Sequence, residues 1–488
     1  MTPANDTANY DETCPLLHAH NPEAQIAEKP KYTPLPKGQL AALCIVRLVD
    51  PIAFTQLFPY VNEFMNDLHL TDDPSKIGFY SGLVESTFAV SQLCSIYQWA
   101  KISDVIGRRP VIFLGIIGLA ITTLMFGLSK SLASVLVARC LGGLFSGNVA
   151  VIHSVLGEIT DSTNQVVALP IYGLTWPLDH LLAGTFSHPA SKYPEILGFQ
   201  FLKDYPYFLP CFIAFVIAMI GIFLGFIFLE EVPSATPRKA VPLIQTMANR
   251  ATTVPALPEK PLSVSKLLSI PIISALALSG FMLSYLATSF DVVFVLFCYS
   301  PIESGGLAFS ASQIGYSLAT SGAIGATIQL CIMSYLLRTF DSAKMYSFCI
   351  SIWPYPFLVL PILNLIARAG LDETTGELGT TTVALLWVGI AFVLMLTKVC
   401  CLAYPVSMIL VKENAPNAAS LGQSNGIVQF AMCFARSFAP FVVSALFSIS
   451  SEYNLLGGQL WLVIMVTVSF LGMKTSRKVE QNSVRTIG

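Results

Sequence analysis

Residues 206–229 of the chain, PYFLPCFIAFVIAMIGIFLGFIFL, carry no charged side chain. An α-helix rises 1.5 Å per residue, so about 20 apolar residues are enough to cross the roughly 30 Å hydrocarbon core of a bilayer. This stretch therefore predicts a transmembrane helix, and the rest of the chain can be read outward from it.

The same pattern recurs on both sides of this stretch. Together the predicted spans run approximately over residues 40–62, 77–99, 110–128, 132–156, 165–186, 206–229, 269–298, 313–336, 344–367, 381–410, 421–449 and 455–473. The fifth is the weakest, because Asp179 and His180 interrupt it. The sequence thus predicts twelve transmembrane helices.

The overall composition agrees with a protein that lies in lipid. Of 488 residues, 54% are hydrophobic and 11% are charged, whereas a soluble domain has about 25% charged residues. The net charge of -2 provides no basic field that would attract nucleic acid. These values exclude an ordinary cytosolic enzyme, a disordered protein and a nucleic-acid binder, and they predict an all-α polytopic membrane protein.

The distribution of basic residues predicts how the helices are oriented. If the N-terminus is cytosolic, 18 Lys and Arg residues fall in cytosolic segments, 5 fall in outer loops, and the remaining four lie within spans. The excess matches the positive-inside rule, so we expect both termini in the cytosol. The Asn5-Asp6-Thr7 sequon then lies in the cytosol and should not be glycosylated.

The longest polar stretch between spans divides the chain into two halves. It covers residues 233–266 and is rich in proline and basic residues. We therefore expect an N-terminal tail (1–38), a first six-helix half (39–232), the cytosolic linker (233–266), a second six-helix half (267–474) and a short C-terminal tail (475–488). Two such halves indicate structural repeats around a central cavity.

Several kinds of chemistry have no support in the sequence. The cysteines lie mostly in spans and indicate buried apolar positions rather than disulfides. There is no phosphate-binding Gly-Lys-Ser/Thr loop and no Gly-x-Ser-x-Gly elbow. We therefore expect no enzyme activity, no cofactor and no metal site. The expected partners are protons and a small-molecule substrate, and the expected oligomeric state is a monomer.

The loop between the second and third spans suggests a family. Residues 100–110, AKISDVIGRRP, resemble the Gly-x-Leu-Ala-Asp-Arg-x-Gly-Arg-Lys signature of the major facilitator superfamily. Arg139 with Gly142-Gly143 and Gly147-Asn148 in span four resembles the second motif of that family. Glu85, Trp99 and Glu158-Ile-Thr-Asp161 stand in local sequences similar to a fungal branch of the drug:proton antiporters, related to plant zinc-induced facilitator-like carriers.

The fifth span departs from the antiporter pattern. The resemblance implies a Gly-Pro pair in that span, but residues 176–184 read WPLDHLLAG. Either the mode of transport differs, or coding residues have been lost from the sequence through a gene-model error.

The charged loop at residues 100–110 predicts a gating latch on the cytosolic side. Asp104 beside Gly107 can accept backbone N–H groups at a helix N-terminus, and Arg108 and Arg109 can pair with Glu158 and Asp161, which share a helix face. Such a cluster would close when the cavity faces outward. The alternative is that the two arginines only set topology.

Buried ionisable residues in the first half predict proton coupling. A charged side chain at mid-bilayer costs about 2.5–3.5 kcal/mol, so it needs a partner or a wet cavity. A buried carboxylic acid can take up and release a proton near neutral pH. We assign Asp50, Glu85, Arg139 and Arg47 to this role. The alternative is that Arg47 and Asp50 only pair with each other.

Further polar residues are candidates for the substrate cavity. Lys398 could pair with Asp291 across the cavity, or could instead sit near a helix kink ahead of Pro405. Amide and aromatic groups in an apolar site fix the orientation of a ligand. The candidates are Gln56, Gln92, Trp176, Tyr285, Asp291, Gln329, Lys398, Gln423 and Asn425.

These features predict a secondary transporter. The leading hypothesis is proton-driven export of a small organic solute by alternating access. The alternatives are a proton-coupled symporter or importer of a sugar or organic anion, and a non-transporting nutrient receptor, which the short C-terminal tail disfavours. Residues 12–17, ETCPLL, match an acidic dileucine signal and suggest the vacuolar membrane, with the plasma membrane as the alternative.

Overall fold

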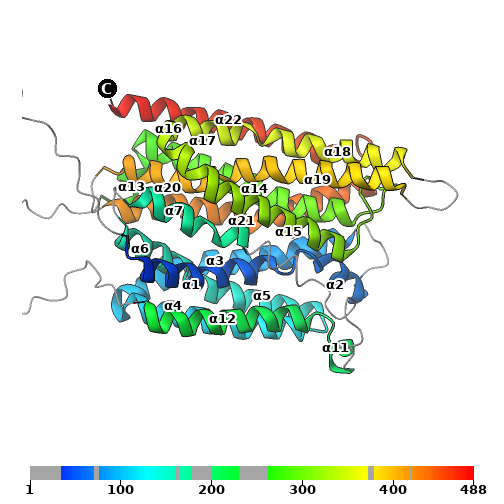
Figure 1. Ribbon diagram of the computed structural model, residues 1–488, viewed down its shortest axis with the longest axis horizontal. Helices are drawn as coiled ribbons and strands as arrows, with labels where there is room; N and C mark the ends of the chain where they lie inside the picture. The colour runs from blue at the N-terminus through cyan, green and yellow to red at the C-terminus, as the bar shows by residue number, and fades with distance from the viewer. Residues whose placement is uncertain are drawn as a thin grey trace, which may run out of the picture.

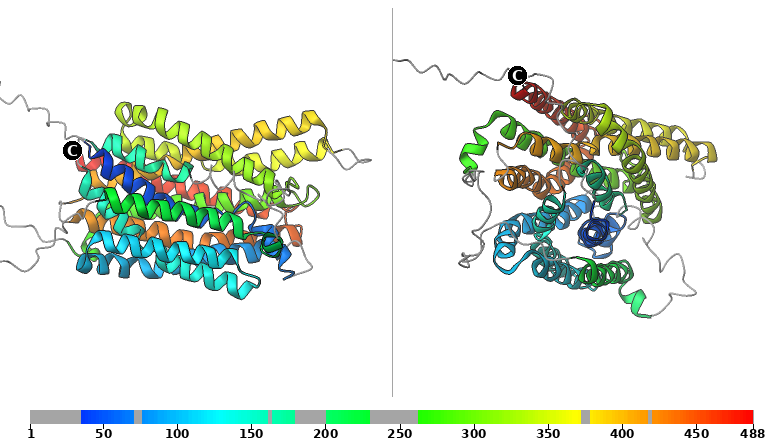
Figure 2. Two further views of the ribbon diagram at one scale, coloured as in Figure 1. Left: turned by 60° about the horizontal axis from the view of Figure 1, so that its bottom comes forward. Right: turned by 60° about the vertical axis from the view of Figure 1, so that its left-hand side comes forward.

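The computed structural model describes residues 35–70, 76–160, 164–178, 200–229, 262–371, 378–416 and 420–487. Within these ranges the chain forms helices, and Leu371 and Leu378 meet in an isolated β-bridge. The long helices run side by side along one axis (Figure 1). Most of the first half, blue to green, lies below the second half, and the right-hand view of Figure 2 shows the same division.

The helices of the first half follow the predicted spans, with short helices at their ends. Their bounds are α1 (Lys37–Thr55), α2 (Val61–Asp67), α3 (Ile77–Ile106), α4 (Arg108–Gly127), α5 (Leu132–Ser146), α6 (Val149–Ile159), α7 (Gln165–Gly173), α11 (Gln200–Asp204) and α12 (Phe208–Phe228). Gly107 joins α3 to α4 with a φ of 102°, a left-handed conformation that favours glycine. The turn can therefore be made without an intervening loop.

The second half begins after the linker. Its helices are α13 (Val264–Leu268), α14 (Pro271–Tyr299), α15 (Ala311–Thr327), the π-helix η2 (Ile328–Ile332), α16 (Met333–Thr339), α17 (Ser342–Ser351), α18 (Pro354–Ala369), α19 (Thr380–Cys401), α20 (Ala403–Glu413), α21 (Leu421–Glu452) and α22 (Leu460–Ile487). Side chains cap several of them: the Asp341 carboxylate accepts the backbone N–H of Lys344 at 3.0 Å, so α17 begins directly after α16.

Ten helical segments of the described residues are long and apolar enough to cross a bilayer. Two predicted spans are missing from that set for different reasons. The helix α3 has 30 residues but contains many polar side chains, and the fifth span is described only as α7 and a helical turn at 175–178. Helix is present in every predicted span, so the prediction of an all-α polytopic fold is confirmed.

The spans are less regular than the sequence predicts. The fourth is split into α5 and α6 at Gly147-Asn148, and the eighth contains η2. The last helix, α22, runs to Ile487 and so includes residues that we assigned to the C-terminal tail. π-helical turns and breaks inside spans are frequent where helices line functional sites.

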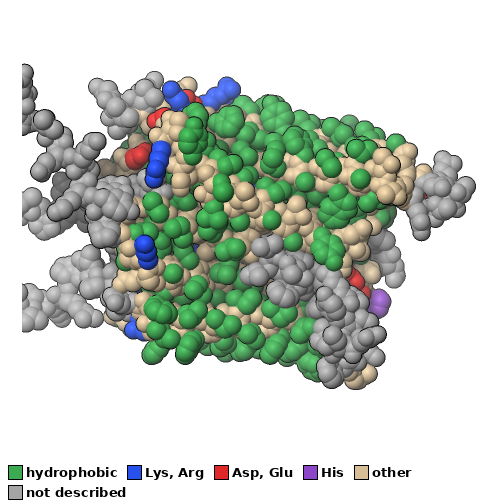
Figure 3. All heavy atoms as spheres, in the orientation of Figure 1, with side chains coloured by type: hydrophobic (Ala, Val, Ile, Leu, Met, Phe, Trp, Pro, Cys, Tyr) green, Lys and Arg blue, Asp and Glu red, His purple; other side chains and the backbone are tan. Residues whose placement is uncertain are grey.

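The outer surface is that of a protein in lipid. Apolar side chains cover the face shown in Figure 3, while Lys and Arg side chains gather toward one end of the molecule. On α12, Phe223 and Phe226 are each 65% exposed. Apolar surface this extensive is not stable in water, and it supports insertion in a bilayer.

Glycines bring α3 and α5 into close contact. A Cβ at Gly143 would lie 2.1 Å from the carbonyl oxygen of Phe88, and one at Gly147 would lie 2.2 Å from Ser95 Oγ. Small residues allow helices in membranes to approach at backbone distance. The glycines of span four therefore have a packing role, which fixes the position of Arg139 on α5.

The two halves meet tightly between α3 and α21. Gly78, Gly82 and Ser86 on α3 face Ser448, Ser444 and Phe441 on α21, and we call these six residues the α3–α21 seam. A Cβ at Gly82 would lie 2.5 Å from Ser444 Oγ and 2.8 Å from the Pro440 carbonyl oxygen. The backbone N–H of Phe441 donates to Ser86 Oγ at 3.0 Å.

Candidate functional site

A small cavity lies next to the α3–α21 seam, where the two halves face each other. Its free volume is about 10 Å³, room for about one water molecule and far below the roughly 300–1,000 Å³ of typical ligand pockets, so the site is nearly closed in this conformation. We call it the central cavity, and it is lined by Asp50, Phe54, Phe88, Ala89, Gln92, Trp176 and Arg436.

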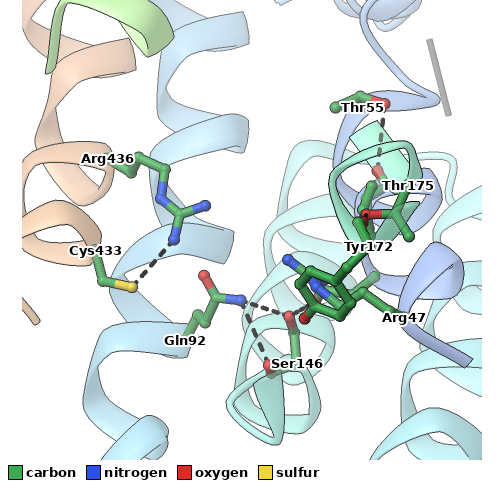
Figure 4. Close-up of polar contacts among 10 residues, drawn as sticks. Arg47, Thr55, Gln92, Ser146, Tyr172, Thr175, Cys433 and Arg436 are labelled. Atoms are coloured by element: carbon green, nitrogen blue, oxygen red, sulfur yellow. Dashed lines mark hydrogen bonds and ion pairs between the residues drawn. The ribbon is translucent and has the colours of Figure 1, made fainter. Parts of the chain in front are cut away.

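A hydrogen-bonded network holds the carboxylate of Asp50. Arg47 Nη1 lies 2.6 Å from Asp50 Oδ2, and the hydroxyl of Ser146 donates to the other oxygen. The amide of Gln92 donates to Ser146 Oγ at 2.6 Å (Figure 4). The pairing that the sequence left as an alternative is thus present, and it stands in the wall of the central cavity.

Two prolines weaken the helices at this level. Pro51 lies inside α1 and Pro440 inside α21. A proline has no N–H to donate to the carbonyl four residues earlier, so the carbonyls of Arg47 and Arg436 lose their helical donors. Both helices can therefore bend next to the central cavity.

Glu85 and Arg139 do not line the central cavity, and they form no ion pair with each other. Glu85 is 3% exposed, and its Oε2 has no hydrogen-bond partner among the described residues. Arg139 Nη1 donates to the Ala53 carbonyl at 2.9 Å, and its guanidinium lies 4.4 Å from the ring centroid of Phe88. The charges of Arg139 and Asp291 both act on Glu85.

Arg436 is a member of the site that the sequence analysis did not select. Its Nη2 donates to Cys433 Sγ at 3.1 Å on the same helix, and its buried Nε has no partner within the described residues. Figure 4 shows Arg436 and Cys433 on α21 facing Gln92 of α3. The available signal was a mid-span arginine four residues before a proline, the spacing that Arg47 and Pro51 share.

Three other predicted cavity residues do not line the central cavity. Gln56 lines a second small cavity that Arg139 also lines. Tyr285 packs between Phe281 and Phe438, with ring centroids 6.4 and 5.7 Å away. Gln329 is buried against Gly173, where a Cβ would lie 2.5 Å from its Nε2.

The remaining predicted residues of the second half do not line the central cavity either. Lys398 packs against Gly325, and its charge acts on Asp291, but within the described ranges the two form no ion pair. Gln423 is exposed and Asn425 half-buried in the first turns of α21. Gln423 stands 13 residues before Arg436, about 20 Å along the helix, and neither it nor Asn425 lines the central cavity.

The predicted latch is described only in part. Asp161 lies outside the described residues, as do Asp179, His180 and the dileucine segment, and the side chains of Asp104 and Glu158 are not described. Arg108 Nη1 donates to Ser103 Oγ at 2.8 Å. Arg109 donates to the Phe226 carbonyl and lies 4.9 Å from the Phe226 ring centroid, so it ties α4 to α12.

Comparison with protein-family models identifies the family of the chain. The model described as Major Facilitator Superfamily matches residues 43–440. The chain belongs to the major facilitator superfamily. The family that the loop at residues 100–110 resembles is therefore confirmed, and the protein is a membrane transporter rather than an enzyme.

Relatives within the superfamily include fungal and plant proteins. The major facilitator-type transporter psiT2 of Psilocybe cyanescens is 39% identical, over 93% of this chain and 92% of its own length. The multidrug transporter mfsB of Aspergillus fumigatus is 26% identical over 87% and 81%. The plant protein Zinc Induced Facilitator 1 of Arabidopsis thaliana is 24% identical over 86% and 85%, which agrees with the predicted branch.

A solved structure supports the fold. The human transporter MFSD10 (TETRAN), described as an organic anion transporter, superposes with a TM-score of 0.58 at 17% identity. The match covers 91% of this chain and 100% of that chain. Identity at this level supports the shared fold alone.

Proposed function

We propose that this transporter exports a small organic solute in exchange for protons. The observation that carries the proposal is the burial of two carboxyl groups, Asp50 in the wall of the central cavity and Glu85 one helical turn before Ala89 of that wall. Relatives named multidrug transporter and efflux pump favour the outward direction. The solute would bind in the central cavity while the halves rock around it.

Glu85 is the group that we assign to the proton. Its unpartnered Oε2 makes the carboxylate form costly in this conformation, and protonation removes that cost. In another conformation Arg139 could turn its free Nε and Nη2 toward Glu85 and stabilise the charged form. The proton would then be released on one side and taken up on the other.

Asp50 differs from Glu85 because its partners are already in place. Arg47 and Ser146 occupy both of its oxygens. We assign it to the positioning of Arg47 and, through Ser146, of Gln92. The cytosolic latch of Asp104, Gly107, Arg108, Arg109, Glu158 and Asp161 would close the cavity on the opposite side from the α3–α21 seam.

The basic end of the molecule is proposed to face the cytosol. Lys and Arg side chains gather toward the end where α22 finishes (Figure 3). The positive-inside rule then puts both termini in the cytosol. The host membrane would be the vacuolar membrane or the plasma membrane.

Proton-coupled import of an organic anion is the second candidate. It is favoured by the absence of the Gly-Pro pair from the fifth span, where residues 176–178 read WPL. A symporter would require the proton and the solute to be bound together, whereas an antiporter binds them in turn.

Transport in proteoliposomes separates these candidates. Purified protein would be tested with a panel of labelled organic solutes, with and without an imposed pH gradient. Antiport predicts uptake into vesicles with an acidic interior, and symport predicts uptake when the outside is acidic. Solute movement that ignores the gradient in both directions would contradict proton coupling.

A further inference from the structure

The central cavity contains one charged group that the protein leaves incompletely partnered. Arg436 donates once to a thiol sulfur, which is a weak acceptor, and its buried Nε has no partner within the described residues. A guanidinium has five N–H donors in a planar fork. Most of its hydrogen-bonding capacity is therefore unused beside the cavity.

The carboxylate in the cavity wall, Asp50, accepts no hydrogen bond from Arg436. The charge of Asp50 acts on Arg436, but the two oxygens of Asp50 are taken by Arg47 and Ser146. The Gln92 amide nitrogen donates to Ser146, and among the described residues no hydrogen bond joins the Gln92 carbonyl oxygen to Arg436. The cavity thus presents a cation whose counterion must come from elsewhere.

The rest of the wall is aromatic. Phe54 and Phe88 lie with their ring centroids 5.5 Å apart, and Trp176 completes the lining. The guanidinium of Arg47 lies 5.9 Å from the Trp176 ring centroid, within the range of a cation–π contact. Aromatic walls bind flat apolar groups, and a planar guanidinium binds an oxyanion with two parallel hydrogen bonds.

We propose that Arg436 binds the anionic group of the substrate, and that the substrate class is a small aromatic oxyanion. The acidic group would pair with Arg436, and the ring would lie against Phe54, Phe88 and Trp176. This inference rests on the proposed transport function, because it assigns a substrate class to the same cavity. It concerns binding, so it can be tested without a proton gradient.

Three probes of similar size test the proposal on purified full-length protein. Benzenesulfonate keeps its charge over the working pH range, benzenesulfonamide is a neutral analogue of nearly the same shape, and benzylammonium is a cation. Binding of each would be measured by equilibrium dialysis at pH 7. The wild-type protein should bind benzenesulfonate at least about tenfold more tightly than benzenesulfonamide.

The variants R436Q and R436K identify the responsible residue. R436Q should lose the preference for benzenesulfonate and bind benzylammonium more tightly, whereas R436K should keep part of the preference because it keeps the charge. R477Q is the matched control, since Arg477 is exposed on α22 and should leave all three affinities unchanged. Misfolding of a variant would instead weaken the binding of all three probes together and lower the melting temperature.

Two results would overturn the proposal. One is a wild-type protein that does not bind benzenesulfonate or binds it no better than benzenesulfonamide. The other is a preference that survives in R436Q. An anion preference without gradient-driven transport would refute the proposed coupling but not this inference, and gradient-driven transport without the preference would refute this inference alone.

Discussion

Glu85 and Asp50 are buried carboxyl groups in the same half of the protein, but their surroundings differ. Asp50 has both oxygens occupied by donors, whereas Glu85 is buried with one oxygen unpartnered in the described structure. A buried carboxylate that lacks donors is unstable as an anion. We therefore assign proton exchange to Glu85 and structural positioning to Asp50.

Replacing Glu85 by glutamine tests this assignment. Glutamine has the shape of the protonated acid but cannot release a proton, so we expect transport driven by a pH gradient to fall by about tenfold or more. Exchange of labelled for unlabelled substrate at equal pH should continue, because that cycle needs no change in protonation. Both rates would be measured in the same proteoliposomes.

The matched control is Glu452→Gln. Glu452 is exposed at the end of α21, so this change removes the same charge without touching the central cavity. It should leave both rates unchanged. If E85Q keeps its full response to the pH gradient, Glu85 does not carry the coupled proton.

At the scale of the helix, the sequence predicts the positions of the spans well, but it predicts poorly which residues of each span face the cavity. The apolar run at residues 206–229 corresponds closely to α12 (Phe208–Phe228), because membrane insertion depends on local hydropathy. Gln423 and Arg436 lie on one helix, yet the cavity is lined by the arginine and not by the amide. Which side chain faces a cavity depends on helix rotation and on the partner helix, and neither is encoded locally.

The proline in α21 is expected to act as a hinge. Pro440 leaves the Arg436 carbonyl without its helical donor, and the next N–H, that of Phe441, donates to Ser86 across the α3–α21 seam. Pro440→Ala restores the donor and stiffens the helix. We expect the melting temperature to rise by about 1 °C, the shift that roughly 1 kcal/mol produces in a chain of this length, while the transport rate falls severalfold.

Pro361→Ala provides the comparison for this prediction. Pro361 also lies inside a helix, α18, but away from the central cavity. The same change should stabilise the protein without slowing transport. Equal transport rates in P440A and the wild type would show that α21 does not bend at Pro440 during the cycle.

The α3–α21 seam depends on the absence of a side chain at Gly82. A valine there would place atoms within 2.8 Å of the Pro440 carbonyl and closer still to Ser444, and overpacking of this kind costs about 1–3 kcal/mol. We expect Gly82→Val to lower the melting temperature and to abolish most transport. Gly426→Val on the same helix as Ser444 is the control, because a Cβ at Gly426 meets nothing within 4 Å. Normal transport by G82V would show that the seam need not close.

At the scale of the whole molecule, the two halves have different contacts along their interface. The α3–α21 seam is packed at backbone distance, and the central cavity follows directly along the same pair of helices, at Ala89, Gln92 and Arg436. Movement of α21 against α3 would therefore change the seam and the cavity together. This arrangement links solute binding to the opening of one side without a separate signalling element.

The orientation of the molecule decides which side the α3–α21 seam closes, and glycosylation can test it. The substitution Pro189→Asn completes an Asn-x-Ser sequon with Ala190 and Ser191, in the segment between the fifth and sixth spans, which we expect outside the cytosol. The variant should gain a glycan in a fungal host, seen as a mobility shift that a glycosidase removes. The natural sequon at Asn5 is the internal control and should stay unmodified. A glycan at Asn5 would reverse the orientation and make the α3–α21 seam the cytosolic gate, so that the export direction would have to be assigned again.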